Sequence, residues 1–523
     1  MTTRTLRSIL ISAACLTVSA ILAGPAPEVG GEAESAAEKV KAYRQAHERD
    51  IIREYMEMLS LPNVASDRPN IRRNADFLAA MFRRRGFAVR LIEAEDAPPA
   101  VLAERSAAGA KTTIALYAHY DGQPVNRAEW TRDPWQPVLL DATVENGGRP
   151  VPLESLPAEG DGEWRLYARS ASDDKAPIIA MAAAADALQS AGIPATANLK
   201  ILLEGEEEAG SPHLAHLLRT DPGLLRADLW LLCDGPVHPT RRHQVYFGAR
   251  GVTGLELTVY GPTRPLHSGH YGNWAPNPAL ALAHLLAGMR DLEGTITIKG
   301  YGQRVRDLTL EERRALDELP RTDESLRREL GLGRTEGQGR TLAELIMRPS
   351  LNIRGTMSGE VEDKAQNAIP TEARASIDLR LVPDQRPEEA QASVEAHLRS
   401  RGFWIVRETP DLGTRLEHPS VVRVRWEEGY PAARTEMSLP VCLALVRVLE
   451  EAAGAPVIRI PLSGGSVPMY LFQTSPASAV VLLPIANHDN NQHGADENIR
   501  LQNLWDGIGI FAALFSRLES PGR

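Results

Sequence analysis

The hydrophobic and polar positions along the chain fall into blocks that predict an alternation of strands and helices. Residues 112–117 form an apolar and β-branched run without strict alternation, which is typical of a central strand covered on both faces. Similar short runs predict strands at 87–92, 199–203 and 228–233, and residues 177–192 predict a helix with Pro near its start and Gly at its end. This alternation predicts an α/β fold, with a parallel-rich mixed sheet and helices on both faces.

The order of predicted elements changes after residue 248. The elements are, in order, a strand at 252–260, a helix at 277–289, strands at 351–355 and 373–381, a helix at 387–400 and a strand at 403–406. This β-α-β-β-α-β order predicts a separate ferredoxin-like α+β domain, with the charged segment 308–348 inserted in it. The α/β pattern resumes with a helix at 440–452, a strand at 479–484 and a helix at 501–518. We therefore expect a catalytic domain in two parts, 46–248 and 431–523, interrupted by a lid or dimerisation domain over 249–430.

The N-terminal segment has the pattern of a secretory signal peptide. Arg4 and Arg7 precede an apolar stretch over 9–22, and small residues follow. We expect a signal peptide over 1–24 and a flexible leader over 25–45, although a helical segment already follows Ser35 and extends to about Leu61. The sequence thus predicts a periplasmic or secreted protein that does not contact the membrane after cleavage. The alternative is an uncleaved N-terminal membrane anchor.

Composition narrows the classes of function. The chain has 523 residues, of which 43% are hydrophobic, so it can bury a large core in two or three domains. A net charge of -10 argues against a nucleic-acid partner, which would require a basic surface. Beyond the predicted signal only Cys233 and Cys442 remain, too few for a disulfide framework or a thiolate zinc motif.

Acidic residues follow the ends of the predicted strands. His119 and Asp121 follow the strand at 112–117, and that pair alone is compatible with an ordinary surface turn. Asp173 and Asp174 precede a predicted helix, and His493 lies in a glycine-containing loop near the C-terminus. The acids that follow the other strands are Glu206, Glu207, Glu208 and Asp234. Strand ends converge at one sheet edge, where clustered carboxylates require a cation. Histidine with carboxylates suits zinc or another divalent ion, or two ions that share a bridging carboxylate.

The motifs around these residues resemble a known superfamily. The matching stretches are AHYDGQPV, ASDDKAP, EGEEEAGS, LLCDG, LHSGHYGN, NAIPTEARASIDLRLVP, SGGSVP and HGADE. In their order and spacing they are similar to the dinuclear zinc metallopeptidases that include carnosinase, cytosolic dipeptidases, glutamate carboxypeptidase, aminoacylase and succinyl-diaminopimelate desuccinylase. The resemblance extends from about Ala46 to Leu518, and it implies a zinc-exopeptidase fold with an interrupting lid domain.

The resemblance also implies roles for the clustered residues. Two divalent ions per subunit are expected, Zn²⁺ foremost, with Mn²⁺ or Co²⁺ as alternatives. The implied ligands are His119, Asp173, Glu208, Asp234 and His493. Asp173 would bridge the ions, Glu208 and His493 would complete one site, and His119 and Asp234 the other. Asp121 would orient His119, Glu207 would be the general base, and the peptide bond between Asp173 and Asp174 would be cis.

The implied substrate pocket draws on both domains. Its expected residues are His267, Asn367, Arg380, Gly464, Gly465 and Ser466. The expected function is hydrolysis of dipeptides or short peptides with a free C-terminal carboxylate. One alternative is an N-acyl-amino-acid amidohydrolase of the same fold. The other is a non-catalytic binding ectodomain, and the presence of the general base Glu207 argues against this second alternative. A homodimer is also expected, in which His267 would serve the neighbouring subunit's site.

Overall fold

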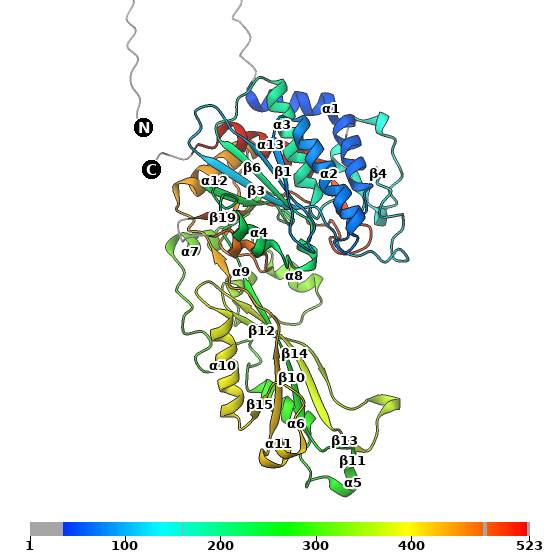
Figure 1. The fold of residues 1–523 in the computed structure, drawn as a ribbon, viewed down its shortest axis with the longest axis vertical. Coiled ribbons are helices and arrows are strands. Elements are labelled where there is room, and N and C mark those ends of the chain that lie inside the picture. The colour runs from blue at the N-terminus through cyan, green and yellow to red at the C-terminus, as the bar shows by residue number, and fades with distance from the viewer. Residues whose placement is uncertain (1–34, 159, 474–477, 520–523) are drawn as a thin grey trace, which may run out of the picture. The chain divides into compact units, whose positions relative to one another are not determined.

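The main sheet supports the candidate site. The computed structural model describes residues 35–158, 160–473 and 478–519. An eight-stranded sheet runs in the order β1-β2-β6-β3-β7-β19-β8-β18 (Figure 1). Its strands are β1 (Ala88–Ile92), β2 (Ala100–Arg105), β3 (Thr113–His119), β6 (Asn198–Glu204), β7 (Leu229–Leu232), β8 (Gln244–Tyr246), β18 (Ile458–Ile460) and β19 (Ala479–Leu482). β3 pairs in parallel with both β6 and β7, so all three strands end at the same edge.

The central strand β3 is covered on both faces. Ile114 and Leu116 belong to one hydrophobic cluster, and Ala115 and Tyr117 belong to another on the opposite side, as the two-residue period of a strand requires. Most of the long helices supply the first cluster: α1 (Ala36–Leu59), α2 (Arg68–Arg84), α3 (Lys175–Ser190), α12 (Pro440–Ala453) and α13 (Leu501–Arg517). The second cluster includes residues of α4 (Leu214–Thr220) together with Met469 and Phe472. The predicted α/β class with helices on both faces is confirmed.

A second sheet forms the core of the interrupting segment. It has five strands in the order β12-β14-β10-β16-β15. They are β10 (Gly251–Tyr260), β12 (Ser350–Met357), β14 (Glu372–Leu381), β15 (Trp404–Val406) and β16 (Val421–Trp426), and helices α6 (Pro278–Ala287) and α10 (Pro387–Ser400) contribute to the same apolar core. A separate ribbon pairs β11 (Leu266–His267) with β13 (Ala368–Ile369), next to the short helix α5 (Ser268–Tyr271).

The charged insertion folds into three short helices that contact both sheets' segments. They are α7 (Leu310–Asp317), α8 (Asp323–Glu329) and α9 (Leu342–Ile346). Leu316 and Met347 of this region share a small apolar cluster with Val382, which follows β14, and Leu462, which follows β18. Thr309 and Thr341 start α7 and α9 with capping boxes, which explains why such short helices form in a polar segment. Ordered helices therefore form in the segment that the sequence marked only as a charged insertion.

Several elements differ from the sequence prediction. β2 was missed, although it pairs antiparallel with both β1 and β6. β16 was also missed, and it places the second sheet's fifth strand between β10 and β15. The segment between β3 and α3, for which no strand was predicted, contains β4 (Val138–Leu140) and β5 (Arg165–Tyr167), which join β20 (Asn498–Arg500) in a three-stranded sheet. Short strands of three to six residues carry too little periodicity to stand out from loops.

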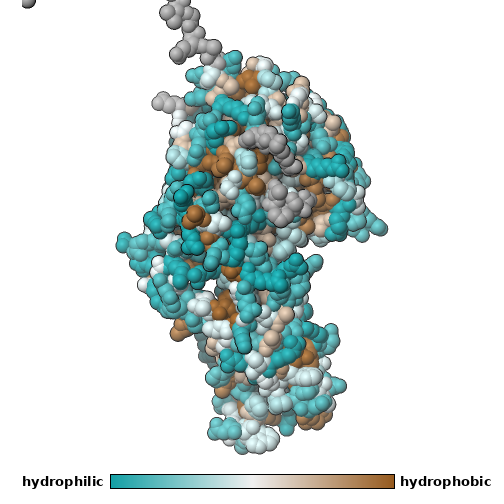
Figure 2. Space-filling view, turned by 90° about the vertical axis from the view of Figure 1, so that its left-hand side faces the viewer, coloured by the Kyte–Doolittle hydropathy of each residue, from teal (hydrophilic) through white to brown (hydrophobic). Residues whose placement is uncertain are grey.

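The N-terminal predictions fall largely outside this description. The predicted signal peptide at 1–24 lies outside the described residues. Helix α1 begins at Ala36, so the part of the predicted leader from 36 to 45 is helical. Among the helices of the described ranges, none combines the length and hydrophobicity needed to cross a bilayer. Figure 2 shows a largely hydrophilic face, as expected for a chain in which 24% of residues are charged.

Candidate active site

The candidate site lies where β3, β6 and β7 end. His119 is the last residue of β3, Glu207 and Glu208 begin the single turn that follows β6, and Asp234 comes two residues after β7. Asp173 comes from the loop between β5 and α3, and its peptide bond to Asp174 is cis, as predicted. His493 comes from the loop before β20 and has a φ of 64°. Parallel pairing of the central strands thus converts distant sequence positions into neighbours.

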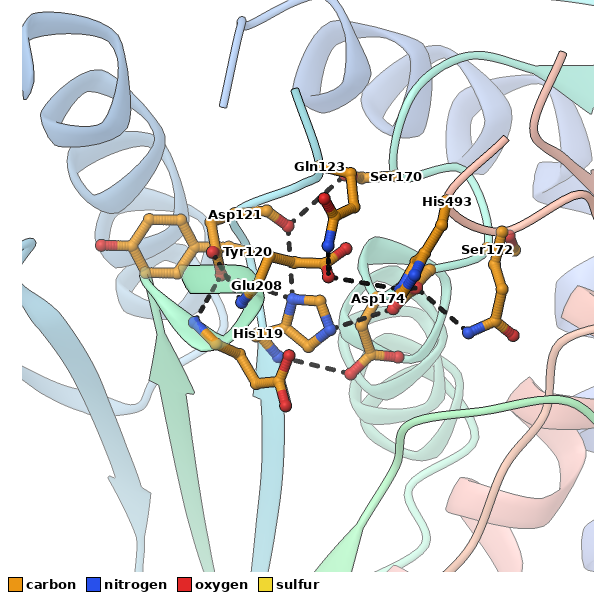
Figure 3. A network of polar contacts seen from close by, with 12 residues as sticks. His119, Tyr120, Asp121, Gln123, Ser170, Ser172, Asp174, Glu208 and His493 are labelled. Carbon is orange, nitrogen blue, oxygen red and sulfur yellow. Dashed lines mark hydrogen bonds and ion pairs between the residues drawn. The ribbon is translucent and has the colours of Figure 1, made fainter. Parts of the chain in front are cut away.

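The carboxylate of Asp173 lies between two histidines. His119 Nε2 is 3.0 Å from Asp173 Oδ1, and His493 Nε2 is 3.2 Å from Asp173 Oδ2. His493 Nε2 is also 3.3 Å from Glu208 Oε2, so its ring faces two carboxylates at once (Figure 3). Asp173 therefore contacts His119 through one carboxylate oxygen and His493 through the other.

Two groups of side chains have the composition and spacing of metal sites. His119, Asp173 and Asp234 form one group, and Asp173, Glu208 and His493 form the other; within each group the potential ligand atoms lie within 4.8 Å of one another. Asp173 belongs to both. One histidine and two carboxylates in each group are a donor set that zinc and similar divalent ions accept, and a shared carboxylate is the usual bridge between two ions. The residues present therefore fit a dinuclear centre.

The clustered carboxylates of these groups favour a positive charge among them. Burial, with the negative charge of Asp173, raises the pKa of Asp234 to about 7. Hydrogen bonds with Asp173 and Glu208 raise the pKa of His493 to about 10, because these two carboxylates stabilise its protonated ring. Burial opposes ionisation of Asp173, but its hydrogen bonds from both histidines hold its pKa below the usual range. A bound divalent ion would replace these protons as the balancing charge.

Asp121 organises the turn that carries two acids. Its Oδ1 accepts a hydrogen bond from the Glu207 backbone N–H and its Oδ2 accepts one from Glu208, each at 3.1 Å. The same Oδ1 is 3.4 Å from His119 Nδ1, on the side of the ring opposite Asp173. A fully buried carboxylate in this position fixes the orientation of the His119 ring and the entry of both glutamates.

Glu207 differs from its neighbour in its surroundings. Its side chain belongs to neither ligand group, whereas Glu208 belongs to one of them. Burial, together with the charges of Asp234 and Glu204 and against that of His119, raises the pKa of Glu207 to about 8. A carboxyl group held beside the ligands with a pKa near neutrality can exchange a proton with a reacting molecule.

The predicted substrate residues fall into two separate places. Arg380 of β14 donates a hydrogen bond to Ser466 Oγ at 2.9 Å, and thereby joins the second sheet to the turn of Gly464, Gly465 and Ser466. His267 pairs with Ala368 in the β11–β13 ribbon, and Ser268 N–H donates to the carbonyl of Asn367 at 2.9 Å. Within the described part of the chain, no hydrogen bond or ion pair joins His267 or Asn367 to the two ligand groups.

The sequence prediction missed several side chains that touch the ligands. Gln123 donates to Glu208 Oε2 at 2.7 Å, and Gln492 donates to Asp173 Oδ2 at 3.2 Å. The backbone N–H of His119 donates to Asp174 Oδ2 at 3.3 Å. Gln123 lies in the same motif as His119, and Gln492 directly precedes His493, so proximity in sequence was the available signal. An amide side chain is chemically too common to be selected on that signal alone.

The comparisons with known proteins agree with this geometry. A model of peptidase family M20/M25/M40 matches residues 115–517, and the chain belongs to this family. It is therefore a metal-dependent hydrolase of a family that forms dinuclear metal centres and includes metallodipeptidases, and the superfamily that the motifs predicted is confirmed.

Individual relatives cover most of the chain. A Cys-Gly metallodipeptidase of Schizosaccharomyces pombe is 26% identical over 484 residues, which are 88% of this chain and 94% of that protein. A Beta-Ala-His dipeptidase of Homo sapiens is 27% identical over 80% of this chain and 77% of that protein. The crystal structure of an M20 family metallo-carboxypeptidase from Sulfolobus solfataricus superposes with a TM-score of 0.72 and 26% identity, over 90% of this chain and 99% of that one.

The predicted periplasmic or secreted location is contradicted by these relatives. The Cys-Gly dipeptidases among them are cytosolic enzymes. The prediction rested on the apolar run of residues 9–22, which lies outside the described residues. A basic start followed by an apolar run is a short and permissive pattern, so it weighs less than likeness over most of the chain.

The pKa values predict proton release when the metal-free protein binds Zn²⁺. His493, with a pKa of about 10, holds a proton at pH 7 and must lose it to bind a metal through its ring. We expect His493→Asn to release about one proton fewer per chain than the wild type at pH 7, with the difference vanishing above about pH 10. Calorimetric titration in buffers of different ionisation enthalpy counts these protons. Equal release by both proteins at pH 7 would contradict the placement of His493 at the centre.

Proposed function

We propose that this protein is a dimetal dipeptidase that hydrolyses dipeptides or short peptides with a free C-terminal carboxylate. The observation that carries the proposal is the pair of His and carboxylate groups that share Asp173. The Arg380 to Ser466 hydrogen bond adds a cation and a hydroxyl for a substrate carboxylate. The dipeptidase activity named for the relatives supports the same substrate class.

Five side chains would hold the ions. His119 and Asp234 would complete one site and Glu208 and His493 the other, with Asp173 as the bridge. When bound, two divalent ions polarise the scissile carbonyl and lower the pKa of the attacking water. The nitrogen and oxygen donors suit Zn²⁺ best, and Mn²⁺ or Co²⁺ are compatible with the same set.

Glu207 would move the proton. Asp121 fixes its backbone N–H, so the side chain is directed by a residue that also orients His119. Glu207 would take a proton from the attacking water and pass it to the leaving amine nitrogen. Its environment already favours proton uptake near neutral pH, which is what such a relay needs.

The substrate carboxylate would lie between the two domains. A guanidinium carries five N–H donors, and Arg380 directs its Nε to Asp378 at 3.0 Å and its Nη1 to Ser466 at 2.9 Å, so donors on its outer nitrogens remain for a substrate carboxylate. Gly464 and Gly465 have no side chains to block approach to that turn, in which the Gly465 N–H donates to Ser463 Oγ at 3.3 Å. Asn367, which lies beside His267 at the β11–β13 ribbon, would contribute from that ribbon.

A first prediction separates the general base from the ligand. Glu207→Gln removes the ionisable group but no ligand, so turnover should fall by about a hundredfold or more while metal content stays at the wild-type value. Glu208→Gln should instead lose metal. Glu206→Gln is the matched control, because Glu206 bonds to His213 outside the ligand groups and its loss should change turnover only a few-fold. Kinetics and metal analysis of the three purified variants make the comparison. Retained metal in Glu208→Gln with loss in Glu207→Gln would reverse the two roles.

A second prediction tests the substrate class. The metal-loaded enzyme should hydrolyse a free dipeptide, and kcat/KM for the same dipeptide amidated at its C-terminus should fall about 10- to 100-fold, the effect of losing one charge-assisted contact. The loss should disappear in Arg380→Ala. N-acetyl amino acids test the alternative deacylase function, since they present the same carboxylate with an acyl group in place of the first residue. Faster hydrolysis of these than of every dipeptide would favour the deacylase.

The proposed enzyme is a homodimer in which His267 acts on the neighbouring subunit's site. His267 is exposed on the β11–β13 ribbon and lies apart from the ligand groups of its own chain. Strand β12 is an edge of the five-stranded sheet, and six of its eight residues are exposed. Trp274 and Met357 are 79% and 60% exposed on the same domain, which is unusual for large apolar side chains without a partner.

Mixing two inactive variants tests this assembly. His267→Ala and Glu207→Ala should each be inactive, and subunit exchange between them should restore roughly a quarter of wild-type activity. In random mixing half of the dimers are mixed, and one of their two sites is intact. Subunit exchange is verified with differently tagged chains. Absence of recovery in verified mixed dimers would show that His267 does not act across a dimer interface.

A further inference from the structure

Glu497 makes an unusually complete set of hydrogen bonds to the loop that carries Asp173. Its Oε1 accepts hydrogen bonds from Ser172 N at 2.9 Å, Ser172 Oγ at 2.8 Å and Asp173 N at 2.9 Å. Its Oε2 accepts hydrogen bonds from Ser170 N at 2.8 Å and Arg169 Nη1 at 2.9 Å. Glu497 is fully buried, so every one of these contacts is made without competing water.

The contacts explain why a buried carboxylate is tolerated here. An isolated buried carboxylate is costly, and burial alone would favour its protonated form. Arg169 supplies one full positive charge, and three backbone N–H groups add partial charges aimed at the same two oxygens. Five donors converge on the two oxygens, one more than the four lone-pair sites of a carboxylate, so its accepting capacity is fully used. The backbone of the loop is therefore held in the one shape that presents all of these donors.

Glu497 lies on the same loop as His493, four residues later. The two residues contact Asp173 from different directions: His493 meets its carboxylate, and Glu497 meets its backbone N–H. The carbonyl of Glu497 also accepts a hydrogen bond from Ala168 N–H at 3.1 Å, which ties the two loops along their length. The C-terminal loop thus delivers one candidate ligand and fixes the position of another.

We propose that Glu497 is a positioning residue that sets the place of the bridging carboxylate and thereby the affinity for both metal ions. The inference rests on the proposed function in one respect, namely that Asp173 is shared between two ions. Glu497 touches neither ion nor substrate. Because Asp173 belongs to both ligand groups, release of its loop weakens both sites together, whereas loss of His493 or His119 weakens mainly one.

Glu497→Gln is the informative change because it keeps the size and removes one accepting oxygen. The amide NH₂ would face N–H donors on one side of the loop, either Ser170 and Arg169 or Ser172 and Asp173. At least two donors would then lose their acceptor. We expect Zn²⁺ affinity to fall about 10- to 100-fold at both sites, the range found for residues that support metal ligands. At saturating Zn²⁺, kcat and KM should return to within a few-fold of the wild-type values.

Asp489→Asn is the matched control in the same loop. Asp489 is ion-paired with Arg165 at 2.7 Å and Arg500 at 3.2 Å, and it belongs to neither ligand group. We expect it to lower the melting temperature while Zn²⁺ affinity stays within about threefold of the wild type. Ser172→Ala is a milder test that leaves the backbone contacts in place, and it should weaken Zn²⁺ binding by a smaller factor. It keeps the proposal testable should Glu497→Gln fail to fold.

The measurement is calorimetric titration of the metal-free full-length proteins with Zn²⁺, with circular dichroism to verify folding. Wild-type binding of two ions, weakened at both sites by Glu497→Gln and preserved by Asp489→Asn, is the expected result. Equal binding by wild type and Glu497→Gln, or equal weakening by Asp489→Asn, would overturn the positioning role. If folded Ser172→Ala bound Zn²⁺ as tightly as the wild type while Glu497→Gln did not fold, the role would also be overturned. A wild type that binds fewer than two ions would instead refute the dinuclear centre itself.

Discussion

The structure of the site depends on the repulsion among carboxylates gathered at one edge of a buried sheet. Burial raises the pKa values of Asp234 and Glu207. The protonated ring of His493 balances part of the negative charge of Asp173 and Glu208. A fold that collects acids in this way gains nothing in stability from them. The arrangement is intelligible as a receptor for divalent ions, whose charge removes the repulsion that the fold creates.

Two buried carboxylates hold the loops that carry the candidate ligands in place. Asp121 anchors the turn of Glu207 and Glu208 by their backbone N–H groups. Glu497 anchors the backbone of the Asp173 loop in the same manner. In both cases a buried carboxylate grips the main chain of a segment whose side chains act at the site. Such contacts restrict the loop without occupying the positions that ligands need.

The candidate site residues are distributed over two sheets. The ligand groups and Glu207 belong to the main sheet, while Arg380 belongs to the second sheet and reaches Ser466 across the boundary. His267 and Asn367 form a third place on the β11–β13 ribbon. In the function that we propose, Arg380 would hold the substrate carboxylate while the ligand groups and Glu207 act on the peptide bond. The edge strand β12 and the exposed Trp274 and Met357 lie in the segment through which we propose that a second copy of the chain binds.

The sequence by itself determined the α/β class, the superfamily and the acidic strand ends, because apolar periodicity and short motifs such as ASDDKAP are local properties. It did not show β2 or β16, whose few residues form strands only because neighbours offer paired backbone groups. Only the tertiary structure assigned Glu497 to the Asp173 loop and Gln123 to Glu208. It also set His267 apart from the ligand groups. Such relations join residues far apart in the chain, and the packing of the sheets, which no local pattern encodes, decides which of them meet.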